Sequence, residues 1–123
     1  MKVHSIVIPA YDEQEIIQDT FKRLQAIFPN TPEDNFEFIF VNDGSRDQTG
    51  VMLELQHQKD ARFKAIHLSR NFGHQIALTA GIEAASGVTV SVLDTDLQDP
   101  PELIKDFYDQ DRLENGKLRE YIL

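Results

Sequence analysis

The sequence predicts an α/β fold in which a mostly parallel sheet carries helices on both faces. Two patterns alternate along the chain: short apolar stretches with β-branched residues, and longer stretches in which apolar residues recur every three or four positions. Clusters of glycine, proline, aspartate and asparagine separate them. A strand–helix order that repeats in this way favours parallel strands joined by crossover helices. The length of 123 residues indicates one domain with a modest core.

The first strand and helix are predicted from a change of period near the amino terminus. Residues 4–9 are apolar and β-branched, as expected of a short buried strand. Helical spacing follows over residues 16–28, and the prolines and asparagine of 29–32 end it. Residues 36–41 are rich in aromatic and branched side chains and predict the second strand, which a turn signal at 42–44 ends.

The second helix is predicted from a capping pattern and an apolar stripe. Ser45 and Gln48, three residues apart, match a capping box, in which the serine hydroxyl accepts a hydrogen bond from the first turn of the helix. Val51, Met52 and Leu55 then supply the apolar stripe that is expected to face the sheet.

The second half of the chain predicts two further strand–helix pairs. Strands are expected at residues 64–68 and 88–93, with a helix between them over 73–85. The small-residue face of that helix consists of Ile76, Ala77, Ala80 and Ala84. The last helix is expected to open at Pro100 or Pro101, because proline suits the first helical position. Its apolar residues are Leu103, Ile104 and Phe107.

The composition excludes several classes of function. The chain has 12 Lys and Arg against 21 Asp and Glu, a formal charge of -9, so we expect no nucleic-acid partner. It has no cysteine, which excludes disulfides, thiolate zinc sites, iron–sulfur clusters and a cysteine nucleophile. We also expect neither a signal peptide nor a membrane span, because no run of about 18 apolar residues occurs.

Acidic residues follow three of the four expected strands. They are Asp12 and Glu13 after the first strand, Asp43 after the second, and Asp94 and Asp96 after the fourth. Because ligands of open α/β sheets bind outside the carboxyl ends of the strands, these carboxylates are expected to converge on one edge. A turn or helix cap is the simpler role for Asp12 or Asp47 taken singly. The set together indicates a site.

A divalent cation is the counter-charge that these residues could offer to a diphosphate. The first strand is followed by neither G-x-x-x-x-G-K-[ST] nor G-x-G-x-x-G, which disfavours a P-loop NTPase and a typical dinucleotide fold. Mg²⁺ and Mn²⁺ prefer oxygen ligands and often keep substrate phosphates among them. Asp94 and Asp96 lie two residues apart, which places both carboxylates on one side of an extended segment. The amide oxygen of Gln98 is a further candidate ligand.

The four histidines lack the spacing of a zinc site. His67 lies within an apolar strand and is expected to be packed, and His4 and His57 are expected at the surface. His74 opens a predicted helix, where a structural role is favoured over a specific one.

Four motifs, in their order and spacing, resemble a family-2 glycosyltransferase. They are I-V-I-P-A-Y-D-E at 6–13, V-N-D-G-S-R-D at 41–47, L-S-R-N-F-G at 68–73 and L-D-T-D-L-Q-D-P-P-E at 93–102. The resemblance covers residues 4 to about 107. More narrowly, the chain looks like the polyprenyl-phosphate branch, which includes dolichol-phosphate mannosyltransferase and bactoprenol glucosyltransferase. The resemblance implies a nucleotide-diphospho-sugar transferase (GT-A-like) fold, here truncated, with Mg²⁺ or Mn²⁺ as cofactor.

The resemblance also implies which residues bind the nucleotide-diphospho-sugar donor. Those expected to line the nucleoside pocket are Pro9, Tyr11 and Glu13. Asp43 is expected to contact the uracil or guanine base, Asp94 the ribose or sugar, and Arg70 the base or a phosphate. Those expected to bind the cation on the diphosphate are Asp96 and Gln98.

Two departures from the family pattern bear on activity. Thr95 stands where this branch usually has alanine, and it is small enough to leave the site open. The chain also stops near the middle of the family's catalytic domain. The catalytic base, the acceptor-binding helices and the membrane segments are therefore expected beyond Leu123. We interpret residues 1–108 as the nucleotide-sugar-binding part and 109–123 as a helical or frayed tail that need not belong to the natural protein.

The resemblance implies an inverting, metal-assisted transfer of a sugar from a nucleotide-diphospho-sugar, UDP-linked, to a polyprenyl phosphate or a saccharide. The expected location is the cytoplasm, at the cytoplasmic face of a membrane for the longer protein. Two alternatives stay open. A sugar-phosphate nucleotidylyltransferase would need a glycine-rich loop with Arg or Lys after the first strand, which residues 9–13 lack. A fragment that binds nucleotide without turnover would need only the donor site.

Overall fold

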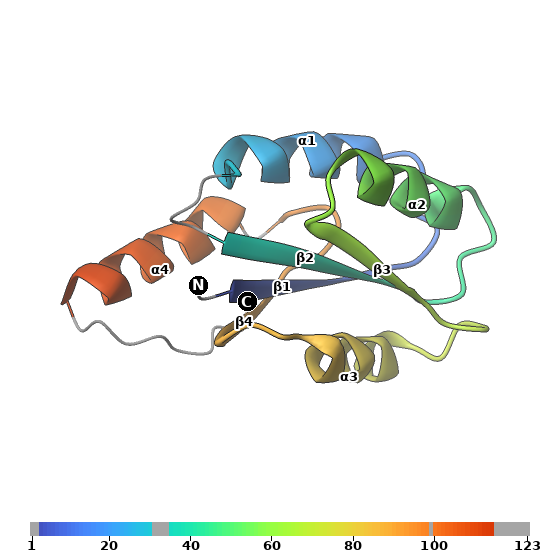
Figure 1. Cartoon of the computed structure of the whole chain (residues 1–123). Coiled ribbons are helices and arrows are strands. Elements are labelled where there is room, and N and C mark those ends of the chain that lie inside the picture. The colour runs from blue at the N-terminus through green and yellow to red at the C-terminus, as the bar shows by residue number, and fades with distance from the viewer. Residues whose placement is uncertain (1–2, 31–34, 99, 115–123) are drawn as a thin grey trace.

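The computed structural model describes residues 3–30, 35–98 and 100–114 and confirms the alternation of strands and helices (Figure 1). The strands are β1 (Val3–Ala10), β2 (Asn35–Asn42), β3 (Phe63–His67) and β4 (Thr89–Val92). The helices are α1 (Ile17–Ile27), α2 (Thr49–Lys59), α3 (His74–Ala84) and α4 (Pro101–Glu114). Each strand and helix expected from the sequence is present.

The strands form one parallel sheet of four strands in the order β3-β2-β1-β4. β1 is central and pairs with β2 on one side and with β4 on the other. Helices cover both faces, with α1 and α2 on one face and α3 on the other (Figure 1). Because β2 and β3 lie on one side of β1 and β4 lies on the other, the strand order reverses between β1 and β4. In open α/β sheets such a switch point is where ligands bind.

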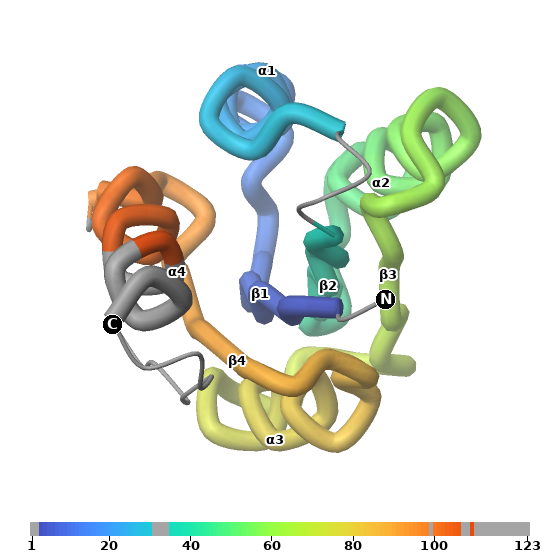
Figure 2. Tube along the Cα trace, turned by 60° about the vertical axis from the view of Figure 1, so that its left-hand side comes forward, coloured from blue at the N-terminus to red at the C-terminus, as the bar shows by residue number. Residues whose placement is uncertain are grey.

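Each face of the sheet has its own apolar core. The face under α1 and α2 is aromatic: Phe21 of α1 meets Phe40 and Phe63 edge-on, with ring centroids 5.4 Å and 5.5 Å away. Figure 2 shows α3 on the opposite side of the sheet. There the contact is close because Gly81 has no side chain, and a Cβ at this position would lie 2.3 Å from Val7 Cγ1.

The predicted capping box of α2 is wrong. The helix begins at Thr49, and the Ser45 hydroxyl accepts a hydrogen bond from the backbone N–H of Asp12 at 3.0 Å. The carboxylate of Asp47 instead accepts hydrogen bonds from the Thr49 N–H (2.9 Å) and hydroxyl (2.6 Å). The serine hydroxyl that the local pattern assigns to the helix thus bonds to the backbone of the β1–α1 loop instead.

The predicted apolar stripe of α2 is wrong at Val51 and Leu55, whereas Met52 is partly buried and packs against the core. Val51 and Leu55 are 56% and 51% exposed, whereas Leu53 is buried together with Thr49 and Gln56. The buried positions follow helical spacing, but two of the three are polar. A pattern of hydrophobic residues alone therefore selects the wrong face of the helix.

Three further expectations about individual side chains do not hold. Ile76 and Ala84 of α3 are exposed, because the residues of this helix that face the sheet are Ala77 and Gly81. His4, expected at the surface, is buried, and its Nδ1 lies 2.9 Å from the Thr89 hydroxyl. His67, expected to be packed, is partly exposed and bonds to a carboxylate of α2.

A buried carboxylate, Glu37 of β2, connects several elements away from the carboxyl edge of the sheet. It accepts hydrogen bonds from Lys64 Nζ (2.7 Å), from the Ser5 hydroxyl, and from the N–H and hydroxyl of Ser86 (both 2.8 Å). Burial raises the pKa of Glu37, but these donors outweigh burial and lower the pKa from 4.5 to about 2. The side chain is therefore a charged structural tie between β1, β2, β3 and the loop that precedes β4.

The last helix is longer than expected. α4 continues to Glu114, so the predicted division after residue 108 falls inside it, and that division stays a prediction. The side chain of Phe107 and residues 115–123 of the predicted tail lie outside the described part of the chain. Among the described residues, no helix combines the length and apolar character needed to cross a membrane.

Candidate functional site

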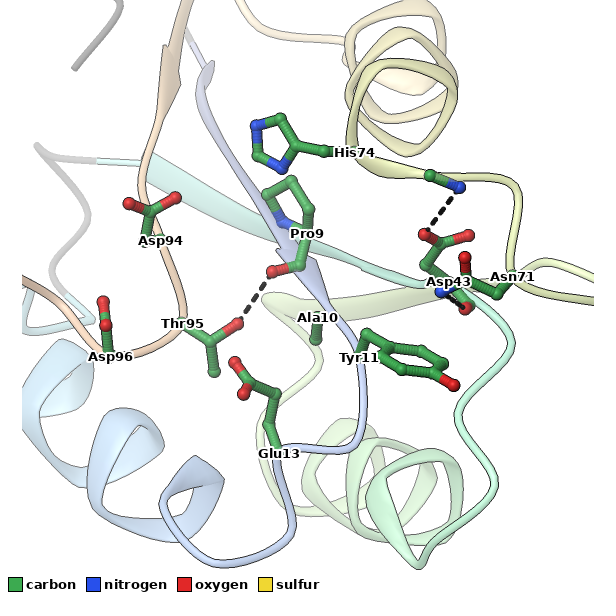
Figure 3. Close-up of a pocket in the computed structure, with 11 residues that line it drawn as sticks. Pro9, Ala10, Tyr11, Glu13, Asp43, Asn71, His74, Asp94, Thr95 and Asp96 are labelled. Atoms are coloured by element: carbon green, nitrogen blue, oxygen red, sulfur yellow. Dashed lines mark hydrogen bonds between the residues drawn. The ribbon is translucent and has the colours of Figure 1, made fainter.

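A cleft of about 450 Å³ opens at the carboxyl edge of the sheet, at the switch point between β1 and β4 (Figure 3). Its walls come from the ends of β1, β2 and β4 and from the start of α3. The lining residues are Pro9, Ala10, Tyr11, Glu13, Asp43, Asn71, Gly73, His74, Asp94, Thr95 and Asp96. The convergence of carboxylates predicted from the strand ends is therefore present in the structure.

Six of the eight predicted site residues line this cleft. They are Pro9, Tyr11, Glu13, Asp43, Asp94 and Asp96. Arg70 and Gln98 do not line it. The Arg70 guanidinium lies over the ring of Phe72 at 4.5 Å from the centroid, and both side chains are exposed. Gln98 donates its backbone N–H to the Asp96 carboxylate (3.3 Å), and its exposed side chain is not part of the cleft wall.

Reciprocal hydrogen bonds hold the β1–α1 loop against the β2–α2 loop. The Asp12 carboxylate accepts hydrogen bonds from the N–H groups of Arg46 (2.7 Å) and Asp47 (3.4 Å). In return, Asp47 accepts one from the Gln14 N–H (3.2 Å). Asp12 adopts a positive φ of 51°, which aspartate tolerates better than most residues. Asp12 and Asp47 thus have the structural roles that were expected of each taken alone, and their hydrogen bonds hold together the loop that carries Tyr11 and Glu13.

Asp43 fixes the opposite wall of the cleft. It is 5% exposed, and its two carboxylate oxygens accept hydrogen bonds from the backbone N–H groups of Phe72 (2.8 Å) and Gly73 (3.1 Å). Gly44 follows it with a φ of +70°, and a Cβ there would lie 2.2 Å from the backbone carbon of Arg70. Only glycine therefore allows the loop after β2 to approach the loop after β3 this closely.

Thr95 anchors the segment that carries Asp94 and Asp96. Its hydroxyl donates a hydrogen bond to the Pro9 carbonyl (2.7 Å), and its own carbonyl accepts one from the Thr20 hydroxyl (2.6 Å). Thr95 is buried, while Asp94 and Asp96 on either side are exposed to the cleft. Residues 94–97 form a turn, closed by a hydrogen bond from the Leu97 N–H to the Asp94 carbonyl (3.0 Å), and not the extended segment that the sequence predicts. Figure 3 shows Thr95 directed toward β1.

Negative charge accumulates at this edge. Burial raises the pKa of Glu13; the nearby Thr95 hydroxyl opposes that rise, and the neighbouring carboxylates of Asp96, Asp47 and Asp94 add to it. Within residues 3–30, 35–98 and 100–114, no group of three or more His, Cys, Asp or Glu side chains is arranged to hold a metal ion. A cation here would have to complete its coordination with ligand oxygens or water.

Sequence reasoning did not single out five of the lining residues as donor contacts. They are Ala10, Asn71, Gly73, His74 and Thr95. Asn71 and Gly73 lie in the L-S-R-N-F-G motif, from which only Arg70 was predicted to bind the donor. The Asn71 side chain donates a hydrogen bond to the Asp43 carbonyl (3.3 Å) and turns toward the cleft (Figure 3). These two residues could have been predicted from the position of L-S-R-N-F-G, which follows a parallel strand at the same edge of the sheet as the carboxylates.

Comparisons with known proteins agree with this fold. The chain is 50% identical over 101 residues to the glycosyltransferase YkcC of Bacillus subtilis (strain 168), covering 82% of the chain and 31% of that protein. It is 39% identical over 105 residues to an undecaprenyl-phosphate 4-deoxy-4-formamido-L-arabinose transferase of Pseudomonas syringae pv. syringae (strain B728a), covering 85% and 31%. The chain thus spans about a third of the length of these relatives.

Solved structures show the same architecture. S. aureus TarS 1-349 in complex with UDP superposes with a TM-score of 0.66 at 25% identity, over 88% of this chain and 33% of that one. The mannosyltransferase PcManGT from Pyrobaculum calidifontis, in complex with GDP-Man and Mn2+, gives 0.66 at 18% identity, over 82% and 29%, and supports the fold alone. The profile of Glycosyl transferase family 2 matches residues 5–113. The chain belongs to glycosyl transferase family 2.

Proposed function

We propose that this chain forms the donor-binding part of a glycosyltransferase that takes a sugar from a nucleotide-diphospho-sugar, UDP-linked, with inversion at the anomeric carbon. The observation that carries the proposal is the cleft at the switch point, where carboxylates from three strand ends meet. The UDP complex of S. aureus TarS, which shares this fold at 25% identity, supports a uridine nucleotide as the ligand.

The two ends of the cleft suit the two ends of such a donor. Tyr11 is 40% exposed and, with Pro9 and the buried Asp43, offers a flat apolar surface and an acceptor to a base. Each Asp43 oxygen keeps a second lone pair beyond the backbone hydrogen bond that it accepts. Asp94 and Asp96 face the cleft from the end of β4, where the diphosphate would lie. Arg70 keeps its proposed contact with the base or a phosphate, at the rim of the cleft rather than inside it.

The residues present fit a divalent cation that is shared with a diphosphate. Mg²⁺ in such sites is held by one or two carboxylates together with substrate phosphates and water, so a preformed cluster of three side chains is not required. Asp96 would supply a carboxylate to the cation, and Asp94 would contact the ribose or sugar. Gln98 stays a proposed ligand of the cation although its side chain does not line the cleft. When bound, Mg²⁺ or Mn²⁺ would offset the charge that builds on the leaving diphosphate.

The proposed reaction is a single displacement. An acceptor oxygen bonds to the anomeric carbon from the face opposite the nucleotide, and the bond from that carbon to the diphosphate oxygen breaks with its electron pair leaving on the diphosphate. A phosphate acceptor is already an anion and needs no base, whereas a sugar hydroxyl does. The name of the Pseudomonas relative supports a polyprenyl phosphate acceptor. Such a lipid would place the longer protein at the cytoplasmic face of a membrane.

Two alternative functions would require different features of the same cleft. A sugar-phosphate nucleotidylyltransferase requires basic residues in the loop after β1, where this chain has Tyr11-Asp12-Glu13. A nucleotide-binding part without turnover would need only the donor site. Donor hydrolysis separates them, because a binding part alone leaves UDP-sugar intact.

Calorimetry with UDP in the presence and absence of Mn²⁺ tests the proposal. The parent chain is expected to bind UDP more tightly with Mn²⁺, and Asp96→Ala is expected to lose that increase. Glu83→Ala, which removes an exposed carboxylate of α3 outside the cleft, is the matched control. Equal Mn²⁺-dependent affinity in Asp96→Ala and the parent would refute the role of Asp96, and no UDP binding by the parent would refute the donor site.

A further inference from the structure

The side chains that line the cleft offer a diphosphate many hydrogen-bond acceptors and few hydrogen-bond donors. Four carboxylates line it, from Glu13, Asp43, Asp94 and Asp96. Of the described lining residues, only His74 has a side chain that can carry a positive charge. A divalent cation near Asp96 would offset part of the charge of a diphosphate, but the remaining phosphate oxygens still need hydrogen-bond donors, since unpaired charge is costly away from water.

The position of His74 is fixed by the buried carboxylate of Asp43. It is the first residue of α3, and the Gly73 before it has a φ of +101° and donates its N–H to the Asp43 carboxylate at 3.1 Å. Figure 3 shows the imidazole over Pro9, between the Asp43 side of the cleft and the Asp94 side. A nucleoside diphosphate whose base lies at Asp43 and whose cation lies at Asp96 would extend past His74.

The ring of His74 is free to meet a ligand. His67 is bonded to Asn42 and Glu54, and His57 lies 2.6 Å from the Phe63 carbonyl. The His74 side chain is exposed and makes no hydrogen bond to any other residue that the structure describes. Its removal therefore leaves the packing of α3 intact, which makes substitution a test of binding rather than of folding.

We infer that His74 donates a hydrogen bond from its imidazole N–H to the diphosphate of the bound nucleotide. The inference rests on the proposed function and extends it by naming a second, metal-independent contact to the same group. A neutral imidazole has one N–H and a protonated one has two, so the donor is available in either state.

Binding of UDP and of uridine separates this contact from a general effect on the site. UDP affinity is measured by calorimetry with Mn²⁺, and uridine affinity by ligand-observed NMR. His74→Ala is expected to weaken UDP by about tenfold or more, since a hydrogen bond to a charged group contributes at least that factor. Uridine, which has no phosphate, is expected to bind His74→Ala and the parent equally.

Two further variants sharpen the result. His74→Gln keeps an N–H donor and is expected to recover a large part of the UDP affinity, while Gln75→Ala, an exposed neighbour outside the cleft, is expected to match the parent. Unchanged UDP affinity in His74→Ala, or an equal loss for UDP and uridine, would overturn the inference while leaving the donor site in place. A parent chain that does not bind UDP would overturn the proposed function and this inference together.

Discussion

Replacing Asp43 by asparagine is expected to loosen the wall of the cleft from which α3 begins. Asp43 is 5% exposed, and each of its oxygens accepts one backbone N–H, from Phe72 at 2.8 Å and from Gly73 at 3.1 Å. Asparagine keeps one oxygen and replaces the other with an NH₂ group. One of the two N–H groups therefore loses its acceptor and faces a second donor.

The cost follows from the energy of such bonds. A hydrogen bond to a charged group contributes roughly 1.5–3 kcal/mol, and a buried donor left without a partner is penalised further. We expect Asp43→Asn to lose about 2–3 kcal/mol of the free energy of unfolding. For a domain of this size the melting temperature falls by roughly 4 °C for each kcal/mol, so the expected drop is about 10 °C. Because the same segment carries Asn71 and His74, UDP affinity is expected to fall as well.

Urea unfolding followed by circular dichroism measures the loss of stability, and amide hydrogen exchange locates it. Exchange at Phe72 and Gly73 is expected to accelerate more than exchange in the core strands. Asp19→Asn on the exposed side of α1 removes the same charge without a buried bond and serves as control. Coincident unfolding midpoints for the two variants, together with unchanged protection of the Phe72 amide, would refute the role assigned to Asp43.

Two other predictions concern stability. Gly44→Ala is expected to lose more than about 2 kcal/mol in urea unfolding, because it adds a positive-φ penalty to a Cβ placed 2.2 Å from the backbone of Arg70; a smaller loss would mean that the two loops separate readily. Glu37 has a pKa lowered from 4.5 to about 2, so its ion pair stabilises the fold above pH 4.5, and up to about 3 kcal/mol is lost as the pH falls through that range. Glu37→Gln is expected to flatten this part of the stability–pH curve, and an unchanged slope between pH 4.5 and 2 would contradict the assignment.

The fold and the position of the site could be predicted because both follow from local patterns. The apolar, branched stretches specify strands, and their alternation with helices specifies parallel pairing. Parallel strands place their carboxyl ends at one edge, so Asp43, Asp94 and Asp96 had to meet there. The turn over residues 94–97, by contrast, differs from the extended segment that the spacing of Asp94 and Asp96 predicts.

Contacts between separate loops could not be predicted from local patterns. Ser45 matches a capping box, yet its hydroxyl is taken by the Asp12 N–H, which lies 33 residues earlier in the chain. Arg70 was expected in the site because of the family resemblance, but its guanidinium lies over the ring of Phe72 and does not line the cleft. His74 entered the cleft because Asp43 holds the residue before it, and this bond joins positions 30 residues apart. Such bonds depend on strand order, which the sequence does not state.

A crystal structure of the chain with UDP and Mn²⁺, in which the ion is located by its anomalous scattering, tests the central claim most directly. We expect the uracil beside Tyr11 and Asp43, and Mn²⁺ bonded both to the diphosphate and to a carboxylate of Asp94 or Asp96. A nucleotide bound away from the switch point, or an ion on the diphosphate that touches neither aspartate, would contradict the account.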